Sequence, residues 1–249
     1  MDDVRPPWQD RPDRLSGERI MAIDTCIFDA YGTLFDVNSA ARLAAEDGTF
    51  PQLADTWQRL AADWRDKQLQ YSWIRAITKE HCDFWQVTQA GLDYALEASG
   101  LSGDDALRDR LLKLYWELSV YPEVPDMLGT LKDAGKATGI LSNGSPEMLQ
   151  GAVTSGGVGR LLDHVLSVES VGVFKPDARV YDMVGRAFGC EAGNVLFVSS
   201  NGWDAAAATG YGFTTVWVNR GGLPMDNLPW TPAHVLTDLT GIPDLVGSL

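Results

Sequence analysis

The sequence predicts an α/β fold, in which a doubly wound, Rossmann-like parallel sheet carries an inserted helical cap subdomain. Two observations predict the sheet: short apolar runs alternate with helical patterns, and polar, glycine-containing loops follow those runs directly. A third observation predicts the cap, because the alternation stops between about residues 37 and 120 and only helical patterns remain there.

The first strand of this sheet is predicted from Ala22 to Phe28 (AIDTCIF) and ends at Asp29, before the loop AYGT. Further strands are predicted at residues 136–142, 164–168, 194–200 and 213–218, the last of which closes the series. Core helices are predicted at 123–135, from near Pro176, which suits a first helical turn, and from about Trp203. Ligands collect at the carboxyl ends of parallel strands, so we expect the residues that follow these strands to meet.

The cap is predicted from helical patterns at residues 56–77, 83–100 and 105–118. The insert leaves the core after the first strand and returns near Pro122, which would place it over the strand ends as a lid. We therefore divide the chain into a flexible tail (1–20), a core domain (21–36 and 121–249) and a cap (37–120).

Composition limits the classes of protein that this chain can represent. With 249 residues, 45% of them hydrophobic, the chain can bury a full core. Its apolar runs are far shorter than the roughly 18 residues of a membrane span, and residues 1–20 lack the apolar stretch of a secretory signal. We expect a cytoplasmic protein.

Net charge and cysteine content limit the kinds of ligand and site that this chain can have. A formal net charge of -14 opposes nucleic-acid binding and would repel an anionic substrate, so any acid-binding pocket must depend on local cations such as Arg65 and Lys175. The three cysteines form no CxxC pair, which favours neither a disulfide framework nor a zinc site, and Cys26 is interpreted as apolar filler within a strand. The three histidines match no motif, and the cap tryptophans suggest packing or a subunit contact.

Polar residues at four predicted strand ends form a candidate site. Asp29 stands in FDAYGTLFD, Ser142 and Asn143 in LSNGS, Lys175 in VFKPD and Asp204 in SSNGWD. Each residue alone has an ordinary interpretation, because an Asp after a strand is usually a turn or helix cap and Ser-Asn-Gly is usually a turn. Their joint occurrence around a strand-end carboxylate favours a catalytic or binding site.

These segments, together with WRDKQLQYSW and FKPDARVY, resemble the haloacid dehalogenase superfamily over about residues 22–235, and in detail its L-2-haloacid dehalogenases. The resemblance implies hydrolytic conversion of short-chain L-2-haloacids to D-2-hydroxyacids and halide, through a covalent ester on Asp29. It also implies a homodimer. Partners would be the small-molecule 2-haloacid and halide, with no nucleic acid and no membrane.

The site is predicted to work without a metal or other cofactor. Phosphatases of the superfamily bind Mg²⁺ through the nucleophilic Asp, an acid two residues later and acids of a GDxxxD motif. Here Tyr31 occupies the second position, and the GDxxxD segment reads SSNGWD, so that Ser200 replaces an acid and Asp204 alone survives. Mg²⁺ usually needs more than one carboxylate or phosphate oxygen. A carboxylate can displace a halide without protonating it, because halide leaves as an anion.

The resemblance implies further catalytic roles. Water would attack the ester carbonyl of Asp29, with Asp204 and Lys175 activating the water and balancing charge. Hydrogen bonds around the nucleophile and the water would come from Thr33, Ser199 and Asn201. Tyr181 lies six residues after Lys175 and could reach Lys175 or Asp204, although a half-buried helix tyrosine is an equally ordinary interpretation.

Substrate contacts are implied on both sides of the site. Arg65 shares a helical ridge with the apolar Ala61, Leu69 and Trp73, so it either extends to solvent or binds an anion. The resemblance assigns Arg65, Asn143 and Phe84 to the departing halide. It assigns the substrate carboxylate to Ser142 and the backbone N–H groups of Ala30 and Tyr31, and pocket walls to Leu69 and Trp203.

Two other functions compete with this prediction. One is a phosphatase or phosphonate hydrolase of the same superfamily, against which Tyr31 and Ser200 argue. The other is a catalytically silent binding module on the same scaffold, which the retention of Asp29, Thr33, Lys175 and Asp204 does not support.

Overall fold

A computed structural model describes residues 22–249, so the predicted tail of residues 1–20 lies outside the described residues. Within this range, six strands form one parallel sheet in the order β3-β2-β1-β4-β5-β6, which confirms the predicted fold class. The strands are β1 (Thr25–Phe28), β2 (Ala137–Ser142), β3 (His164–Ser167), β4 (Val195–Ser199), β5 (Thr214–Val218) and β6 (His234–Leu236).

The central strands explain the continuous apolar runs of the sequence. β1 lies between β2 and β4, and Phe28 pairs in register with Ile140 on one side and Val198 on the other. Every residue of β1 and of β4 is buried, as expected where helices cover both faces of a parallel sheet. The carboxyl ends of β1, β2 and β4 therefore lie at one edge, where Asp29, Asn143 and Asn201 follow.

Helices of the core follow the strands, and polar caps set where several of them begin. They are α5 (Val124–Asp133), α6 (Pro146–Ser155), α7 (Ala178–Phe188), α8 (Gly202–Tyr211) and α9 (Ile242–Ser248). The Ser145 side chain accepts from the backbone N–H of Met148 at the start of α6. The Asp177 side chain likewise accepts from the backbone N–H of Arg179, and α7 begins at Ala178, two residues after Pro176.

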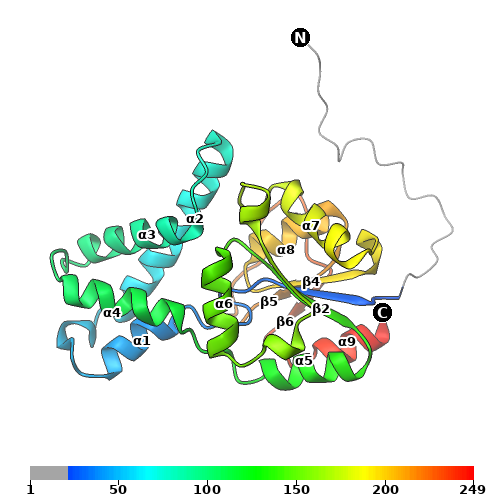
Figure 1. The fold of residues 1–249 in the computed structure, drawn as a ribbon, viewed down its shortest axis with the longest axis horizontal. Coiled ribbons are helices and arrows are strands. Elements are labelled where there is room, and N and C mark those ends of the chain that lie inside the picture. Colours follow the sequence, from blue (N-terminus) through cyan, green and yellow to red (C-terminus); the bar gives the residue numbers. More distant parts are fainter. Residues whose placement is uncertain (1–21) are drawn as a thin grey trace, which may run out of the picture.

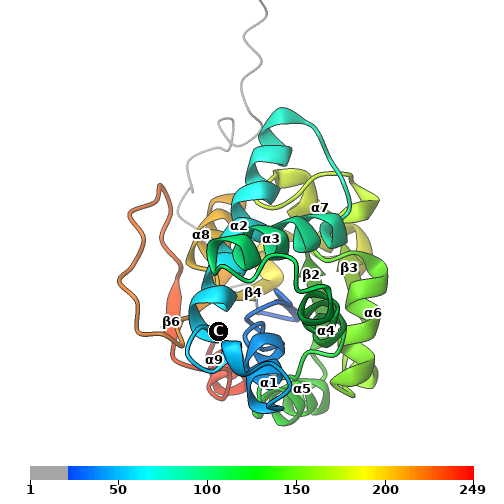
Figure 2. The same ribbon diagram turned by 90° about the vertical axis from the view of Figure 1, so that its left-hand side faces the viewer.

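The cap lies in the chain between β1 and α5 and forms a separate helical block beside the core (Figure 1). Its helices are α1 (Ser39–Glu46), α2 (Trp57–Thr78), α3 (Phe84–Ala98) and α4 (Asp105–Trp116). Viewed from that side, α2, α3 and α4 stand in front of the sheet (Figure 2). The two linkers pair with each other, since Asp36 N–H donates to Ser119 O and Tyr121 N–H donates to Leu34 O.

The sequence analysis was wrong about the end of the sheet. The strand 213–218 does not close the series, because β6 pairs in parallel with β5 through His234 and Val216. β6 has three residues and none of them is buried, so it lacks the apolar run by which the other strands were recognised.

The packing of the interior explains one of the cysteines and one of the cap tryptophans. Cys26 is fully buried in β1, and burial raises the pKa of its thiol to about 12, as befits an inert filler. Trp64 is also buried, with its indole N–H donating to Thr88 O inside the cap. No helix within residues 22–249 is long and apolar enough to cross a membrane.

Candidate active site

Asp29 lies at the carboxyl end of β1 and its side chain accepts hydrogen bonds from three different segments. Lys175 Nζ lies 3.1 Å from Oδ1, and Asn201 Nδ2 lies 2.9 Å from Oδ2. Thr33 Oγ1 lies 3.2 Å from the same Oδ2. The residue is only 6% exposed. Three donors around a buried carboxylate restrict its orientation.

Lys175 joins Asp29 to a second buried carboxylate. Its Nζ also donates to Asp204 Oδ2 at 2.8 Å, while the Tyr181 hydroxyl donates to Asp204 Oδ1 at 2.8 Å. Burial by itself would lower the pKa of Lys175, because it disfavours the charged ammonium. The negative charges of Asp204 and Asp29 outweigh this effect and raise the pKa of Lys175. Burial raises the pKa of Asp204 as well, against the opposing charge of Lys175. Asp204 is therefore a stronger base than an exposed aspartate.

Thr33 connects the nucleophile loop to the loop after β4. Its Oγ1 lies 3.1 Å from Ser200 Oγ and accepts from Ser200 N–H at 2.8 Å. A hydroxyl has one proton, so Thr33 donates either to Asp29 or to Ser200 at any moment. Ser199 acts one step away, because its Oγ accepts from Asn201 N–H at 3.1 Å and does not contact Asp29.

Arg65 reaches the core from α2 of the cap. One nitrogen, Nη2, donates to Tyr31 O at 3.2 Å and to Asn201 Oδ1 at 3.1 Å. The Asn201 amide thus touches both the Asp29 carboxylate and the Arg65 guanidinium. Of the two interpretations of Arg65, the structure favours the one in which it faces the site, where its guanidinium also interacts with the Tyr115 hydroxyl.

Several donors at the strand ends are free to meet an anion. Ser142 Oγ accepts from Gly144 N–H, which leaves its own proton available. Asn143 Oδ1 accepts from the backbone N–H of Lys175, which leaves its Nδ2 as a donor. In the described chain, the backbone N–H groups of Ala30 and Tyr31 donate to no protein acceptor.

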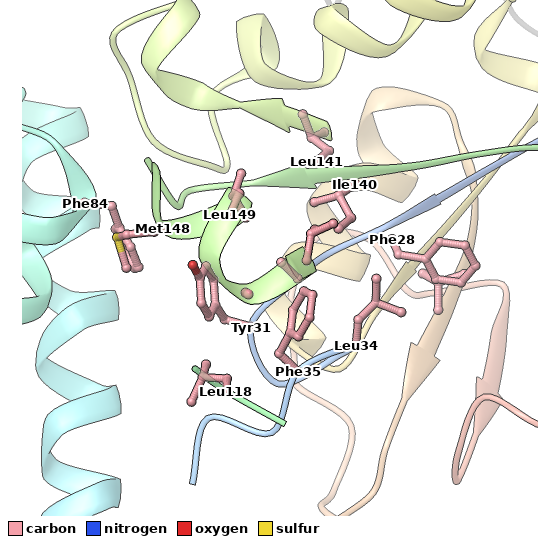
Figure 3. Packing of buried hydrophobic residues seen from close by; sticks show 14 of the residues in the cluster. Phe28, Tyr31, Leu34, Phe35, Phe84, Leu118, Ile140, Leu141, Met148 and Leu149 are labelled. Carbon is pink, nitrogen blue, oxygen red and sulfur yellow. The ribbon is translucent and has the colours of Figure 1, made fainter. Parts of the chain in front are cut away.

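Aromatic side chains from the core and the cap close the site on one side. The Tyr31 ring lies 6.2 Å from Phe84 at the start of α3 and stacks at 5.7 Å on Tyr115 of α4. The Tyr31 side chain projects from its loop toward the region of Phe84 and Met148 (Figure 3). Phe84 packs in turn on Phe174, next to Lys175. These contacts place apolar surface along that side of the site, which strengthens the electrostatic interactions beside it.

Comparisons with known proteins identify the family of this chain. A sequence profile of the haloacid dehalogenase-like hydrolases matches residues 23–212. The chain belongs to this family. It is 42% identical over 224 residues to "(S)-2-haloacid dehalogenase 1" of Pseudomonas sp. (strain CBS-3), covering 90% of this chain and 96% of that protein.

Two solved structures place this haloacid dehalogenase-like hydrolase among close structural relatives. An L-2-haloacid dehalogenase with 40% identity superposes with a TM-score of 0.85, over 91% of this chain and 99% of that one. The L-2-haloacid dehalogenase of Xanthobacter autotrophicus with chloropropionic acid covalently bound is 34% identical and superposes with a TM-score of 0.80, over 91% and 99% of the two chains.

The side chains of two predicted wall residues make no hydrogen bond to the polar network. Trp203, at the start of α8, makes a T-shaped contact at 5.3 Å with Trp73 of the cap, and its indole N–H is buried without an acceptor among the described residues. Leu69 is half-buried on α2. Its backbone oxygen accepts from Ser72, and none of the polar contacts of the site involves its side chain.

Three residues that contact the site were missed as site residues by the sequence analysis. Ser200 was noted for the acid that it replaces, yet it bonds Thr33. Tyr115 supports the Tyr31 ring from the last cap helix. Arg220 donates to Thr33 O at 3.3 Å. Arg220 lies two residues after β5, so its strand-end position could have indicated it, whereas no local signal points to Tyr115.

The donor set does not fit a magnesium ion of the kind that phosphatases of the superfamily hold. Asp29 and Asp204 are both engaged by Lys175 Nζ, and Ser200 Oγ is engaged by Thr33. No other carboxylate joins them, and residues 22–249 contain no group of three His, Cys, Asp or Glu side chains arranged to hold a metal. We therefore derive no catalytic step through a metal.

Proposed function

We propose that this protein is an (S)-2-haloacid dehalogenase, which converts short-chain L-2-haloacids to D-2-hydroxyacids and halide through a covalent ester on Asp29. One observation carries the proposal: a buried carboxylate, oriented by three donors, shares the Asn201 amide with a guanidinium from the cap. A nucleophile and a receptor for an anion thus both contact the side-chain amide of Asn201. The names of the relatives, including one with chloropropionic acid covalently bound, support the same reaction.

Substrate binding would use the donors that the protein leaves unsatisfied. The Ser142 hydroxyl and the N–H groups of Ala30 and Tyr31 lie at the ends of β1 and β2, where they could bind the substrate carboxylate. These donors are uncharged, so they can bind the substrate carboxylate through hydrogen bonds without placing another cation in the site. The substrate carboxylate would then be fixed while C2 faces Asp29.

In the first step, an oxygen of Asp29 forms a bond to C2 and the carbon–halogen bond breaks. The halide leaves with the bonding electron pair, so no proton has to be supplied. The Arg65 guanidinium and the Nδ2 of Asn143 would receive the anion beside the Phe84 ring. Charge that develops on the leaving group is stabilised there by donors that are already in place.

In the second step, water attacks the carbonyl carbon of the Asp29 ester. Asp204 accepts the proton of the water, a role suited to a carboxyl whose pKa is raised by burial. The bond between that carbonyl carbon and the oxygen on C2 then breaks, the oxygen takes one of the two protons of the water to become the product hydroxyl, and Asp204 releases the other to solvent. Asp29 regains a carboxylate that contains one oxygen from water.

Isotope labelling tests the covalent role of Asp29 separately from the reaction class. A single turnover of L-2-chloropropionate in H2(18)O with excess enzyme should give mostly unlabelled D-lactate, and mass spectrometry should find the label on the Asp29 peptide. Direct attack of water on C2 would instead label the lactate and leave Asp29 unlabelled. Absence of halide release from either enantiomer would overturn the dehalogenase function itself.

We propose a homodimer as the assembly of this enzyme. Trp64 and Trp85 of the cap are engaged within it, Trp85 through a ring contact at 4.7 Å with Trp116. Ile74 and Ile77 on α2 are instead exposed, at 50% and 81%, and offer apolar surface for a subunit contact. Sedimentation equilibrium should give twice the chain mass of 27.2 kDa. A monomer at micromolar concentration would contradict the proposal.

A further inference from the structure

Arg220 lies at the point where both linkers of the cap meet the end of β5. Its guanidinium is centred 3.6 Å from the ring centroid of Tyr121, on the returning linker. Its Nη2 lies 2.7 Å from Glu123 Oε1, at the N-terminus of α5. The same Nη2 donates to Thr33 O at 3.3 Å, on the outgoing linker.

These contacts are partly shielded from solvent and directed. The side chains of Arg220 and Glu123 are 22% and 15% exposed, so their ion pair is less screened than a surface pair. Nη2 has two protons, one for each acceptor. Nε is buried and has no acceptor in the described chain. A buried donor without an acceptor is destabilising, so the other contacts of the guanidinium must offset this loss. The guanidinium is thus held over the Tyr121 ring by two acceptors.

Thr33 transmits this arrangement to the nucleophile. Arg220 holds the backbone carbonyl of Thr33, and the Thr33 hydroxyl lies 3.2 Å from Asp29 Oδ2. The path from Glu123 to the reacting carboxylate therefore passes through Arg220 and one threonine. Arg65 holds the same loop from the cap side, through Tyr31 O.

We propose that Arg220 is a positioning residue for the dehalogenase reaction, which fixes the 30–35 loop so that Thr33 orients Asp29. The inference rests on the proposed function, and it adds a residue outside the substrate pocket to the machinery of the nucleophile. Small displacements of a reacting group lower its rate steeply. Loss of Arg220 should therefore lower kcat more than it raises KM.

A double-mutant cycle separates this role from a merely structural one. Arg220→Met should lower kcat about tenfold with KM changed less than about twofold, whereas in a Thr33→Val background it should lower kcat less than about twofold. Arg220→Lys keeps the charge but loses the fork, and should fall between Arg220→Met and the wild type; it replaces Arg220→Met in the cycle if that variant fails to fold. Arg186→Met, which removes an arginine that is 68% exposed on α7, is the matched control and should keep wild-type kcat.

Hydrogen exchange gives a second readout that needs no turnover. The N–H groups of Gly32, Leu34 and Phe35 are hydrogen-bonded within the loop, and the peptide covering them should exchange faster in Arg220→Met than in the wild type or Arg186→Met. Equal fold losses of kcat in both backgrounds, a wild-type kcat in Arg220→Met, or unchanged exchange would overturn the inference. A wild type that releases no halide would overturn the proposed function, while exchange would still show whether Arg220 holds the loop.

Discussion

The core and the cap contribute to the site in different ways. On the core side, Asp29, Lys175 and Asp204 are buried and bond to one another, so that each charge has a partner within the network. On the cap side, Arg65 is half-buried and reaches the core through one nitrogen, Nη2, which donates to Tyr31 O and Asn201 Oδ1. Chemistry and stability are therefore coupled at Lys175, which pairs with both core carboxylates, whereas the cap contributes a charge whose loss should leave the fold intact.

The largest effect is expected for Asp29→Ala. Without the nucleophile, kcat should fall by about four orders of magnitude or more. The fold should remain stable, because Lys175 keeps Asp204 as a partner at 2.8 Å. Halide release and thermal unfolding measured on the same preparation test both statements. A residual kcat within tenfold of the wild type would contradict the nucleophile assignment.

Lys175→Met should show the coupling within the core. Activity should be lost, and the free energy of unfolding at neutral pH should fall by about 3–5 kcal/mol, because two buried carboxylates lose their cation. The pKa of Lys175 is raised in the folded protein. Its contribution to stability is therefore complete below the ordinary lysine pKa and is lost only as pH rises through the folded value. Urea unfolding of the variant and the wild type between neutral and strongly alkaline pH measures the difference, and unchanged stability at neutral pH would break the comparison.

Arg65→Lys should affect the cap side alone. It keeps the charge but loses the planar fork, so we expect kcat to fall about a hundredfold while the free energy of unfolding changes by less than about 1 kcal/mol. Arg59→Lys, on the same helix with a side chain that is 75% exposed, is the matched control. Wild-type turnover in Arg65→Lys would mean that the cap supplies no essential anion receptor.

Tyr181→Phe should give a smaller effect that depends on pH. The hydrogen bond from Tyr181 lowers the pKa of Asp204, so its removal raises that pKa beyond the rise that burial causes. Since the base must be ionised, the acid limb of kcat should move to higher pH in the variant. Above that limb, kcat should stay within about tenfold of the wild type. An acid limb that stays in place or moves to lower pH would show that Asp204 is not the base.

The smallest effect is expected from metal removal. Tyr31 and Ser200 stand where a magnesium site of this superfamily would need acids. Dialysis against EDTA should therefore leave kcat unchanged, with added Mg²⁺ as the comparison. Activity that returned only with Mg²⁺ would show that the core carboxylates hold a metal after all.

Local sequence patterns were sufficient to predict the elements whose residues form a long apolar run or a clear helical period. The buried strands read as apolar runs, and the polar residues behind them met at one edge of the sheet, as the predicted positions of Asp29, Lys175 and Asp204 required. β6 was not predicted, because its three partly exposed residues carry no periodic signal. Arg220 was not predicted as a site residue, because a lone arginine after a strand is usually a solvated charge.

The sequence by itself determined the fold class, the inserted cap and the set of strand-end residues. Strands that are buried on both sheet faces produce runs of apolar residues, and helices produce a regular spacing of apolar residues, so both can be recognised from residues close together in the chain. The tertiary structure alone decided which of those residues touch. Asp29 and Lys175 are 146 positions apart, Arg65 and Asn201 are 136 apart, and Arg220 and Thr33 are 187 apart. Hydrogen bonds depend on ångström distances and on direction, and contacts between such distant positions are set by how the sheet and the cap pack, which no local pattern records.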